Sequence, residues 1–176
     1  MLDVAGTAVY FMHFVLAAAV GLYLWLGDRS RYGSFAASLL VACCLAFVTY
    51  VVLPTQPPWL GHPQDVHKVI DETIGKLGLP GWLVGFYQNR DYNVHAAFPS
   101  LHAAFPLIAT LHAWPRSRRL GVLLGVWTAV VWVAVVYLGE HYVIDVLGGV
   151  AYATVAVLAA AWWRRGAGRW AAPVGS

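Results

Sequence analysis

Charged side chains are scarce in this sequence. Only 11% of its 176 residues are Asp, Glu, Lys or Arg, while 60% are hydrophobic. A soluble domain carries about 25% charged residues, so the composition excludes an ordinary water-soluble globular protein. The length is that of one domain, and we therefore expect a single membrane-embedded domain over residues 1–176.

Cysteine and clustered basic charge are also scarce. Cys43 and Cys44 are adjacent within an apolar run, which is typical of small buried residues rather than of a disulfide or a metal pair. The pI is near 9.0, but no basic stripe with interleaved aromatics is present, which argues against a nucleic-acid partner. No positively charged segment precedes the first apolar run, so we expect no cleavable signal peptide.

What the sequence does contain is long apolar runs. A spanning helix needs about 20 mostly apolar residues. Five runs qualify, at 4–27, 34–53, 96–114, 120–138 and 141–163. Nine tryptophans and nine tyrosines are typical of the aromatic belts at membrane interfaces. The sequence predicts an all-α integral membrane protein of the cell membrane, a bundle of about five transmembrane helices.

The charges between these runs predict their orientation. Eight of the eleven basic residues lie in 27–33, in 115–119 or after 163, and the positive-inside rule makes that side cytoplasmic. The long segment 54–95 is then extracytoplasmic. Within it, prolines predict a rigid turn at 54–60, and apolar residues at helical spacing predict a short cap helix over 66–77. The glycine-rich stretch 78–85 is expected to break that helix.

The first candidate for chemistry is the segment GEHYVID at 139–145. His141 and Asp145 are four residues apart and would share one helix face. A carboxylate on one imidazole nitrogen fixes the tautomer and leaves the other nitrogen as a nucleophile. The alternative is a structural His–Asp pair that joins two helices.

The second candidate is FPSLH at 98–102. Pro99 suits the first turn of a helix. The amides of Ser100, Leu101 and His102 would then form an anion site at the helix start. Ser100 adds a hydroxyl donor, and His102 is placed to protonate a departing alkoxide. Both segments begin apolar runs on the predicted outer side, so we expect one shared site there.

These two motifs resemble those of the type 2 phosphatidic acid phosphatase superfamily, which contains membrane lipid phosphatases and phosphotransferases. Its P-S-x-H motif is met at 99–102, and its H-x3-D pair is met at His141 and Asp145. The resemblance implies that His141 accepts the phosphate, that Asp145 orients it, and that His102 acts as acid and then as base. It implies no metal and no other cofactor.

The sequence also departs from that family. Ala134 and Val135 stand where the third motif has Ser-Arg, and the first motif, K-x6-R-P, is absent. PTQPPW at 54–59, together with both histidine motifs, resembles the inositol phosphorylceramide synthase branch over about 50–149. A phosphodiester carries one negative charge and a phosphomonoester nearly two. A site without the usual cations therefore favours transfer of a head-group phosphate from a phospholipid.

Further residues are candidate substrate contacts around this site. They are Gln56, Trp59, Arg90 and His95. An interfacial side chain is the simpler interpretation of His95. No role is assigned to His13, His62, His67 or His112.

Three alternatives remain. One is a lipid phosphomonoester phosphatase that releases inorganic phosphate. Another is a metal-dependent intramembrane hydrolase with zinc on His95, His102, His141 and Asp145. The third is a non-enzymatic membrane subunit. In each case the expected partners are the bilayer and, for an enzyme, a lipid substrate.

Overall fold

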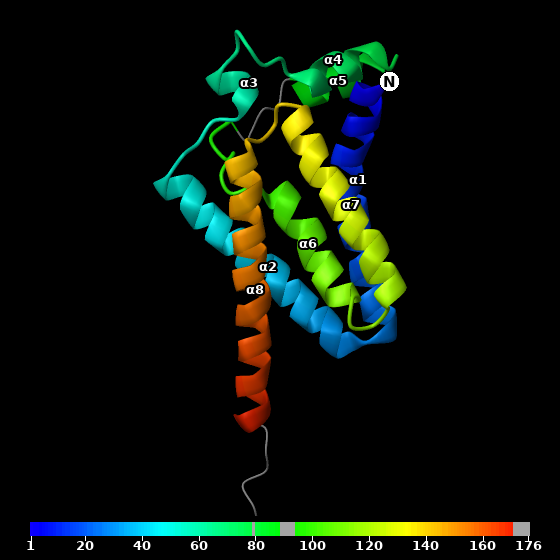
Figure 1. Cartoon of the computed structure of the whole chain (residues 1–176), viewed down its shortest axis with the longest axis vertical. Coiled ribbons are helices and arrows are strands. Elements are labelled where there is room, and N and C mark those ends of the chain that lie inside the picture. Colours follow the sequence, from blue (N-terminus) through cyan, green and yellow to red (C-terminus); the bar gives the residue numbers. More distant parts are fainter. Residues whose placement is uncertain (79, 89–93, 171–176) are drawn as a thin grey trace, which may run out of the picture.

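The protein is a bundle of helices, as the sequence predicted. A computed structural model describes residues 1–78, 80–88 and 94–170 (Figure 1). In that part of the chain the elements are α1 (Leu2–Gly27), α2 (Arg29–Val52), α3 (Pro58–Gly61), α4 (Val69–Lys76), α5 (Gly81–Gln88), α6 (Leu101–Ala113), α7 (Arg118–Tyr137) and α8 (Val143–Trp170). The described residues form no sheet, and only an isolated bridge joins Thr55 to Ala96.

Four helices are long and apolar enough to cross a membrane: α1, α2, α7 and α8 over Val143–Arg165. The predicted third span, 96–114, forms only the 13-residue helix α6. At 1.5 Å per residue this helix is about 20 Å long, shorter than the roughly 30 Å hydrocarbon core. Among the described residues the bundle therefore has four helices long enough to span and one shorter apolar helix, because 96–100 is not helical and Ala96 pairs with Thr55.

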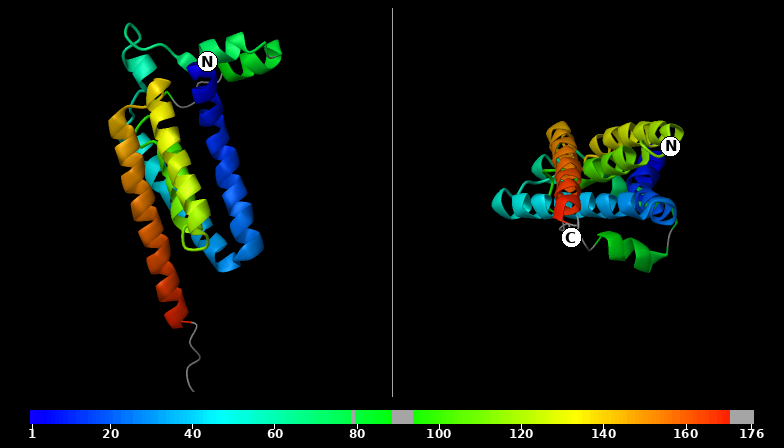
Figure 2. Two further views of the ribbon diagram at one scale, coloured as in Figure 1. Left: turned by 45° about the vertical axis from the view of Figure 1, so that its right-hand side comes forward. Right: turned by 90° about the horizontal axis from the view of Figure 1, so that it is seen from below.

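The short helix α6 lies at the centre of the bundle. It packs against α1, α2, α7 and α8, and Figure 2 shows these helices around it, with α2 crossing the bundle at a tilt. Its contact faces are built largely from small side chains, since Ala103, Ala104 and Ala113 are fully buried. Small residues let helix backbones approach closely within a membrane.

Side-chain contacts at the two ends of the bundle show how the loops are grouped. At one end, Arg116 donates to the carbonyl of Gly27 at 3.2 Å and Arg164 donates to Ser30 Oγ at 3.2 Å. At the other end, Tyr137 donates to Asp3 at 2.7 Å. The arginine-rich loops thus share one end and the two histidine segments share the other (Figure 1). Which end faces the cytoplasm stays a prediction from the positive-inside rule.

The turn between the first two spans is tighter than predicted. The sequence indicated a loop over 27–33, but α2 begins at Arg29 because Asp28 caps it by accepting from the Arg31 backbone N–H at 3.1 Å. The Arg31 guanidinium adds an ion pair at 2.9 Å. The backbone hydrogen bond and this charge hold the pKa of the Asp28 carboxyl below its ordinary value.

The predicted cap is present above the histidine end. Helix α4 occupies most of the predicted range 66–77, and its Ile70 and Ile74 are buried against Leu138. The chain leaves α4 through Gly78, whose φ of +63° suits glycine. The expected break over 78–85 is shorter than predicted, because α5 begins at Gly81. The second half of the predicted proline turn at 54–60 belongs to the single-turn helix α3, which begins at Pro58.

Candidate active site

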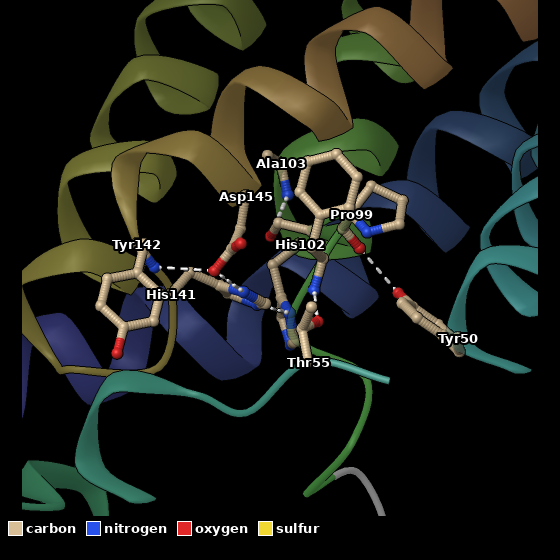
Figure 3. Close-up of polar contacts among 10 residues, drawn as sticks. Tyr50, Thr55, Pro99, His102, Ala103, His141, Tyr142 and Asp145 are labelled. Carbon is tan, nitrogen blue, oxygen red and sulfur yellow. Dashed lines mark hydrogen bonds and ion pairs between the residues drawn. The ribbon is translucent and has the colours of Figure 1, made fainter. Parts of the chain in front are cut away.

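The two histidines singled out by the sequence meet at one end of the bundle. His102 lies in the first turn of α6 and His141 lies just before α8. His102 Nδ1 is 3.1 Å from His141 Nε2, so the rings share a hydrogen bond (Figure 3). His141 and Asp145 are buried, with 6% and 3% of their surfaces exposed. The sequence therefore predicted correctly that FPSLH and GEHYVID converge.

Asp145 holds the turn that carries His141. Its Oδ2 accepts from the Tyr142 backbone N–H at 2.8 Å and lies 3.6 Å from His141 Nδ1. The second distance suits an ion pair but exceeds a hydrogen bond. The prediction that His141 and Asp145 share one helix face is wrong, because α8 begins at Val143. Asp145 instead occupies the third helical position, from which a carboxylate reaches back to the capping residue.

Ser100 and Pro99 are structural rather than exposed to a ligand. Ser100 caps α6 by accepting from the Ala103 N–H at 3.2 Å, so Pro99 precedes the helix and is not in its first turn. The Ser100 N–H donates to the Asp145 carbonyl at 3.0 Å. Three backbone amides were predicted to bind an anion, and the amide of Ser100 is not free to do so because it is bonded to this carbonyl. Leu101 and His102 stand at helix positions that have no acceptor within the helix.

A residue that the sequence did not single out secures the FPSLH segment. Thr55 Oγ1 accepts from the Phe98 N–H at 2.7 Å, and the Thr55 N–H donates to the His95 carbonyl at 3.2 Å. Tyr50, at the end of α2, donates to the Pro99 carbonyl at 2.7 Å. Thr55 lies inside PTQPPW, so the threonine is the residue of this motif that holds the FPSLH segment in place. Its position inside the motif was the only sign in the sequence that Thr55 contributes to the site.

A close backbone approach joins the two histidine segments. At Gly149 of α8, an added Cβ would lie 2.3 Å from the Ser100 carbonyl oxygen. Only glycine therefore lets α8 pass this close to the start of α6. The contact fixes Asp145 and His102 relative to one another.

The predicted substrate contacts are placed unevenly. Gln56 and His95 are exposed. His95 precedes α6, which begins at Leu101, so it is not on the helix that carries His102. Leu101 is partly buried against the core. Arg90 lies outside the described residues.

Trp59 is the candidate contact that lies beside the His141 loop. Its backbone N–H donates to the Gly139 carbonyl at 3.4 Å. Lys68 Nζ lies 4.4 Å from the centre of its ring. Trp59 thus brings the PTQPPW segment and one cationic side chain to the loop that carries His141.

Helix α1 contributes neighbours of His102 that sequence reasoning missed. The Tyr10 ring stacks on His102 at 4.5 Å, and the His13 ring lies 4.7 Å away. Phe14 contacts His102 edge-on at 5.8 Å. The available signal was a histidine within an apolar span, which is costly and often functional.

The position of the family's arginine is occupied by an apolar side chain. Val135 is fully buried and packs with Ala103, Val131 and Val146. Its carbonyl accepts from the N–H groups of Glu140 and His141, both at 3.1 Å. Val135 thus supports the His141 loop through its backbone carbonyl, and its side chain carries no positive charge.

An apolar groove of about 480 Å³ runs along the bundle from the middle of α1 toward the arginine-rich end. Its lining includes Phe14, Ala18, Gly21, Tyr32, Phe35 and Phe105, from α1, α2 and α6. Phe14 contacts both the groove and His102. Phe14 is therefore the side chain that the groove wall and the surroundings of His102 have in common.

No group of three or more His, Cys, Asp and Glu side chains within residues 1–78, 80–88 and 94–170 is arranged to hold a metal ion. His95, which the zinc hypothesis needs, is an exposed residue. This donor geometry does not favour the hydrolase alternative.

Fold and site together define a polytopic membrane protein with a histidine pair and a buried carboxylate at one end of a helical bundle. The sequence pattern of the PAP2 superfamily matches residues 1–159, so the chain belongs to that superfamily. The family resemblance inferred from the two histidine motifs is thereby confirmed.

Two curated relatives fall in the expected branch. The chain is 29% identical over 161 residues to a phosphoinositol dihydroceramide synthase from Bacteroides thetaiotaomicron, covering 86% of this chain and 53% of the relative. It is 29% identical over 119 residues to the catalytic subunit of an inositol phosphorylceramide synthase from Schizosaccharomyces pombe, covering 60% of this chain and 27% of that protein. The chain thus spans about half the length of the first relative and about a quarter of the length of the second. No solved structure matches it significantly.

Proposed function

We propose that this protein is a lipid phosphotransferase that moves a head-group phosphate from a phospholipid to an alcohol through a phosphohistidine. The observation that carries the proposal is the 3.1 Å contact between His102 Nδ1 and His141 Nε2, with Asp145 beside the other nitrogen of His141. One relative described above is named as a phosphoinositol dihydroceramide synthase and the other as the catalytic subunit of an inositol phosphorylceramide synthase, which supports transfer over hydrolysis.

The chemistry follows from the arrangement of these three side chains. Asp145 favours a proton on His141 Nδ1, which leaves a lone pair on Nε2 for attack on phosphorus. As the N–P bond forms and the P–O bond breaks, His102 gives its Nδ1 proton to the departing alkoxide. His102 then takes the proton of the acceptor alcohol, whose oxygen attacks phosphorus and frees His141.

The charge of the site supports a phosphodiester donor. Val135 supplies no cation at the position of the family's arginine, and Lys68, which lies over Trp59, is paired with Asp71 at 3.1 Å. A second negative charge without a partner is costly in an apolar setting. A phosphodiester, with one negative charge, fits this site better than a phosphomonoester.

The groove supports a lipid as the donor. Its apolar lining runs along α1 and α2, two of the helices long enough to span a membrane, and Phe14 in its wall contacts His102. The hydrocarbon chains of a phospholipid are apolar, as are the residues that line this groove, so the groove suits them. With the arginine-rich loops on the cytoplasmic side, the reaction takes place at the extracytoplasmic face.

The test is product identification with purified protein. In detergent, radiolabelled lipid phosphodiesters and phosphomonoesters are supplied with and without alcohol acceptors such as inositol. We expect transfer of the head-group phosphate to an alcohol, with slower transfer to water and no loss of activity in chelator. His141→Ala serves as the inactive control. Preference for a monoester with release of inorganic phosphate would establish the lipid phosphatase alternative, and inactivity on all donors would favour a non-enzymatic subunit.

A further inference from the structure

A third histidine lies buried next to the site, on α1. His13 is 1% exposed, although it lies midway along a membrane-spanning helix. Its Nδ1 contacts the backbone carbonyl of Tyr10. A carbonyl only accepts hydrogen bonds, so Nδ1 carries a proton and Nε2 of the neutral ring is an acceptor. Among the described residues, this buried Nε2 has no hydrogen-bond partner.

His112 shows what a purely structural histidine looks like in this fold. Its Nδ1 likewise contacts a carbonyl of its own helix, that of Ile108, at 2.9 Å. Its Nε2, however, is 3.4 Å from Ser38 Oγ. Buried polar atoms are normally satisfied in this way. His13 differs because its second nitrogen is held without a partner beside the candidate acid.

The His13 ring is close enough to His102 for a hydrogen bond. His102 and His141 are hydrogen-bonded at 3.1 Å with ring centres 5.2 Å apart. The centres of His13 and His102 are 4.7 Å apart, with the rings inclined at 59°. The rings are tilted against each other, so a small ring movement or one bridging water is needed to connect a nitrogen of each ring.

The proposed reaction creates a need for such an acceptor. To protonate the leaving group, His102 must carry protons on both nitrogens, with Nδ1 directed toward the phosphate between the histidines. Its Nε2–H then requires an acceptor in a buried site. Asp145 supplies the corresponding contact for His141.

We propose that His13 is a positioning residue for His102, and this inference rests on the proposed function. When His102 carries the proton for the leaving group, His13 Nε2 accepts the Nε2–H of His102, directly or through one water. His13 itself exchanges no proton with the substrate. The proton that reaches the alkoxide comes from His102 Nδ1.

The test varies the need for a general acid. The His13→Phe variant keeps an aromatic ring and lacks the acceptor. It is assayed on a natural-type phospholipid, whose leaving group is an alkoxide, and on a 4-nitrophenyl alkyl phosphodiester, whose leaving group needs no proton. Formation of the phosphoenzyme is followed in single turnovers, because its breakdown uses His102 as the base with either donor. We expect formation from the phospholipid to slow about tenfold or more, and formation from the aryl ester to stay within about twofold. A packing defect would lower both equally and would overturn the inference.

Matched variants sharpen the result. His13→Gln retains an acceptor oxygen and should restore most phospholipid turnover, while His112→Phe should leave the ratio of the two rates unchanged. If His13→Phe does not fold, His13→Ala with added imidazole replaces it. Recovery of phospholipid turnover supports the inference, and its absence contradicts it. Wild-type protein inactive on both esters would instead refute the proposed function.

Discussion

At the scale of single residues, Asp145 combines two tasks that substitution can separate. It accepts from the Tyr142 N–H and lies beside His141 Nδ1. Asp145→Asn keeps an acceptor for the Tyr142 amide and loses the charge. We expect its activity to fall by about a hundredfold or more with an almost unchanged melting temperature. Asp145→Ala loses both, so its stability should also fall, by about 1 kcal/mol. Equal melting temperatures of the two variants would contradict the capping role.

His102 is expected to serve both halves of the reaction. In His102→Ala, formation and breakdown of the phosphoenzyme should each slow by about 10²–10⁴-fold, because the same imidazole donates and later accepts the proton. Rapid-quench measurement with labelled donor separates the two steps. Phosphohistidine found on residue 102 in the wild-type protein would reverse the assigned roles.

The residues at the site differ in how readily the sequence reveals them. His102, His141 and Asp145 lie in short motifs, where spacing along the chain already indicates chemistry. Tyr10 and His13 belong to a different helix, and they reach His102 only because α1 packs against α6. No local spacing encodes such a contact, so single-sequence reasoning left His13 without a role.

At the scale of helices, Gly149 determines how α8 meets α6. In Gly149→Ala the new Cβ would stand 2.3 Å from the Ser100 carbonyl oxygen, and backbone cannot move aside cheaply. We expect a loss of about 1–3 kcal/mol in stability and a large loss of activity. Gly125→Ala in α7 is the control, since its Cβ would meet only Thr110 Cγ2 at 3.8 Å. Thermal unfolding in detergent compares the two, and equal melting temperatures would contradict the close approach.

The groove between α1 and α2 predicts a chain-length effect. Ala18 lines it, while the neighbouring exposed Ala19 is not among its lining residues. Ala18→Phe should raise KM for a long-chain phospholipid and leave kcat/KM for a short-chain one unchanged. Ala19→Phe should change neither. Loss of activity on both donors in Ala18→Phe would show that the groove does not hold the chain.

The shortness of α6 shows that a hydropathy pattern alone does not predict where this helix begins. Residues 96–100 are nearly as apolar as the helix that follows, so the apolar run alone predicts one continuous span. Their backbone groups instead bond to Thr55 and to Tyr50. Such partners come from distant parts of the chain, and a hydropathy pattern does not contain them.

At the scale of the whole molecule, the distribution of charge predicts which face carries the site. Lys76 is exposed at the histidine end, and Arg119 belongs to the arginine-rich end. In a variant with Cys43 and Cys44 replaced, Lys76→Cys should react with an impermeant maleimide in intact cells. Arg119→Cys should react only after permeabilisation. The opposite pattern would place the site in the cytoplasm.

The grouping of loops at the two ends was predictable from the sequence, because the positive-inside rule acts on each loop separately. The contacts of Arg116 with Gly27 and of Arg164 with Ser30 agree with that grouping. The helix pairing inside the bundle was not predictable. It depends on small residues such as Ala103 and Ala104, which look alike in every span.

The hydrogen bond between His102 and His141 has a consequence for selectivity. In this arrangement the nucleophile and the acid are hydrogen-bonded to each other. A phosphate enters only by separating the rings, and the free energy for that separation has to come from another part of the ligand. A lipid brings hydrocarbon chains and inorganic phosphate brings none. We therefore expect inorganic phosphate to compete only weakly with the lipid donor.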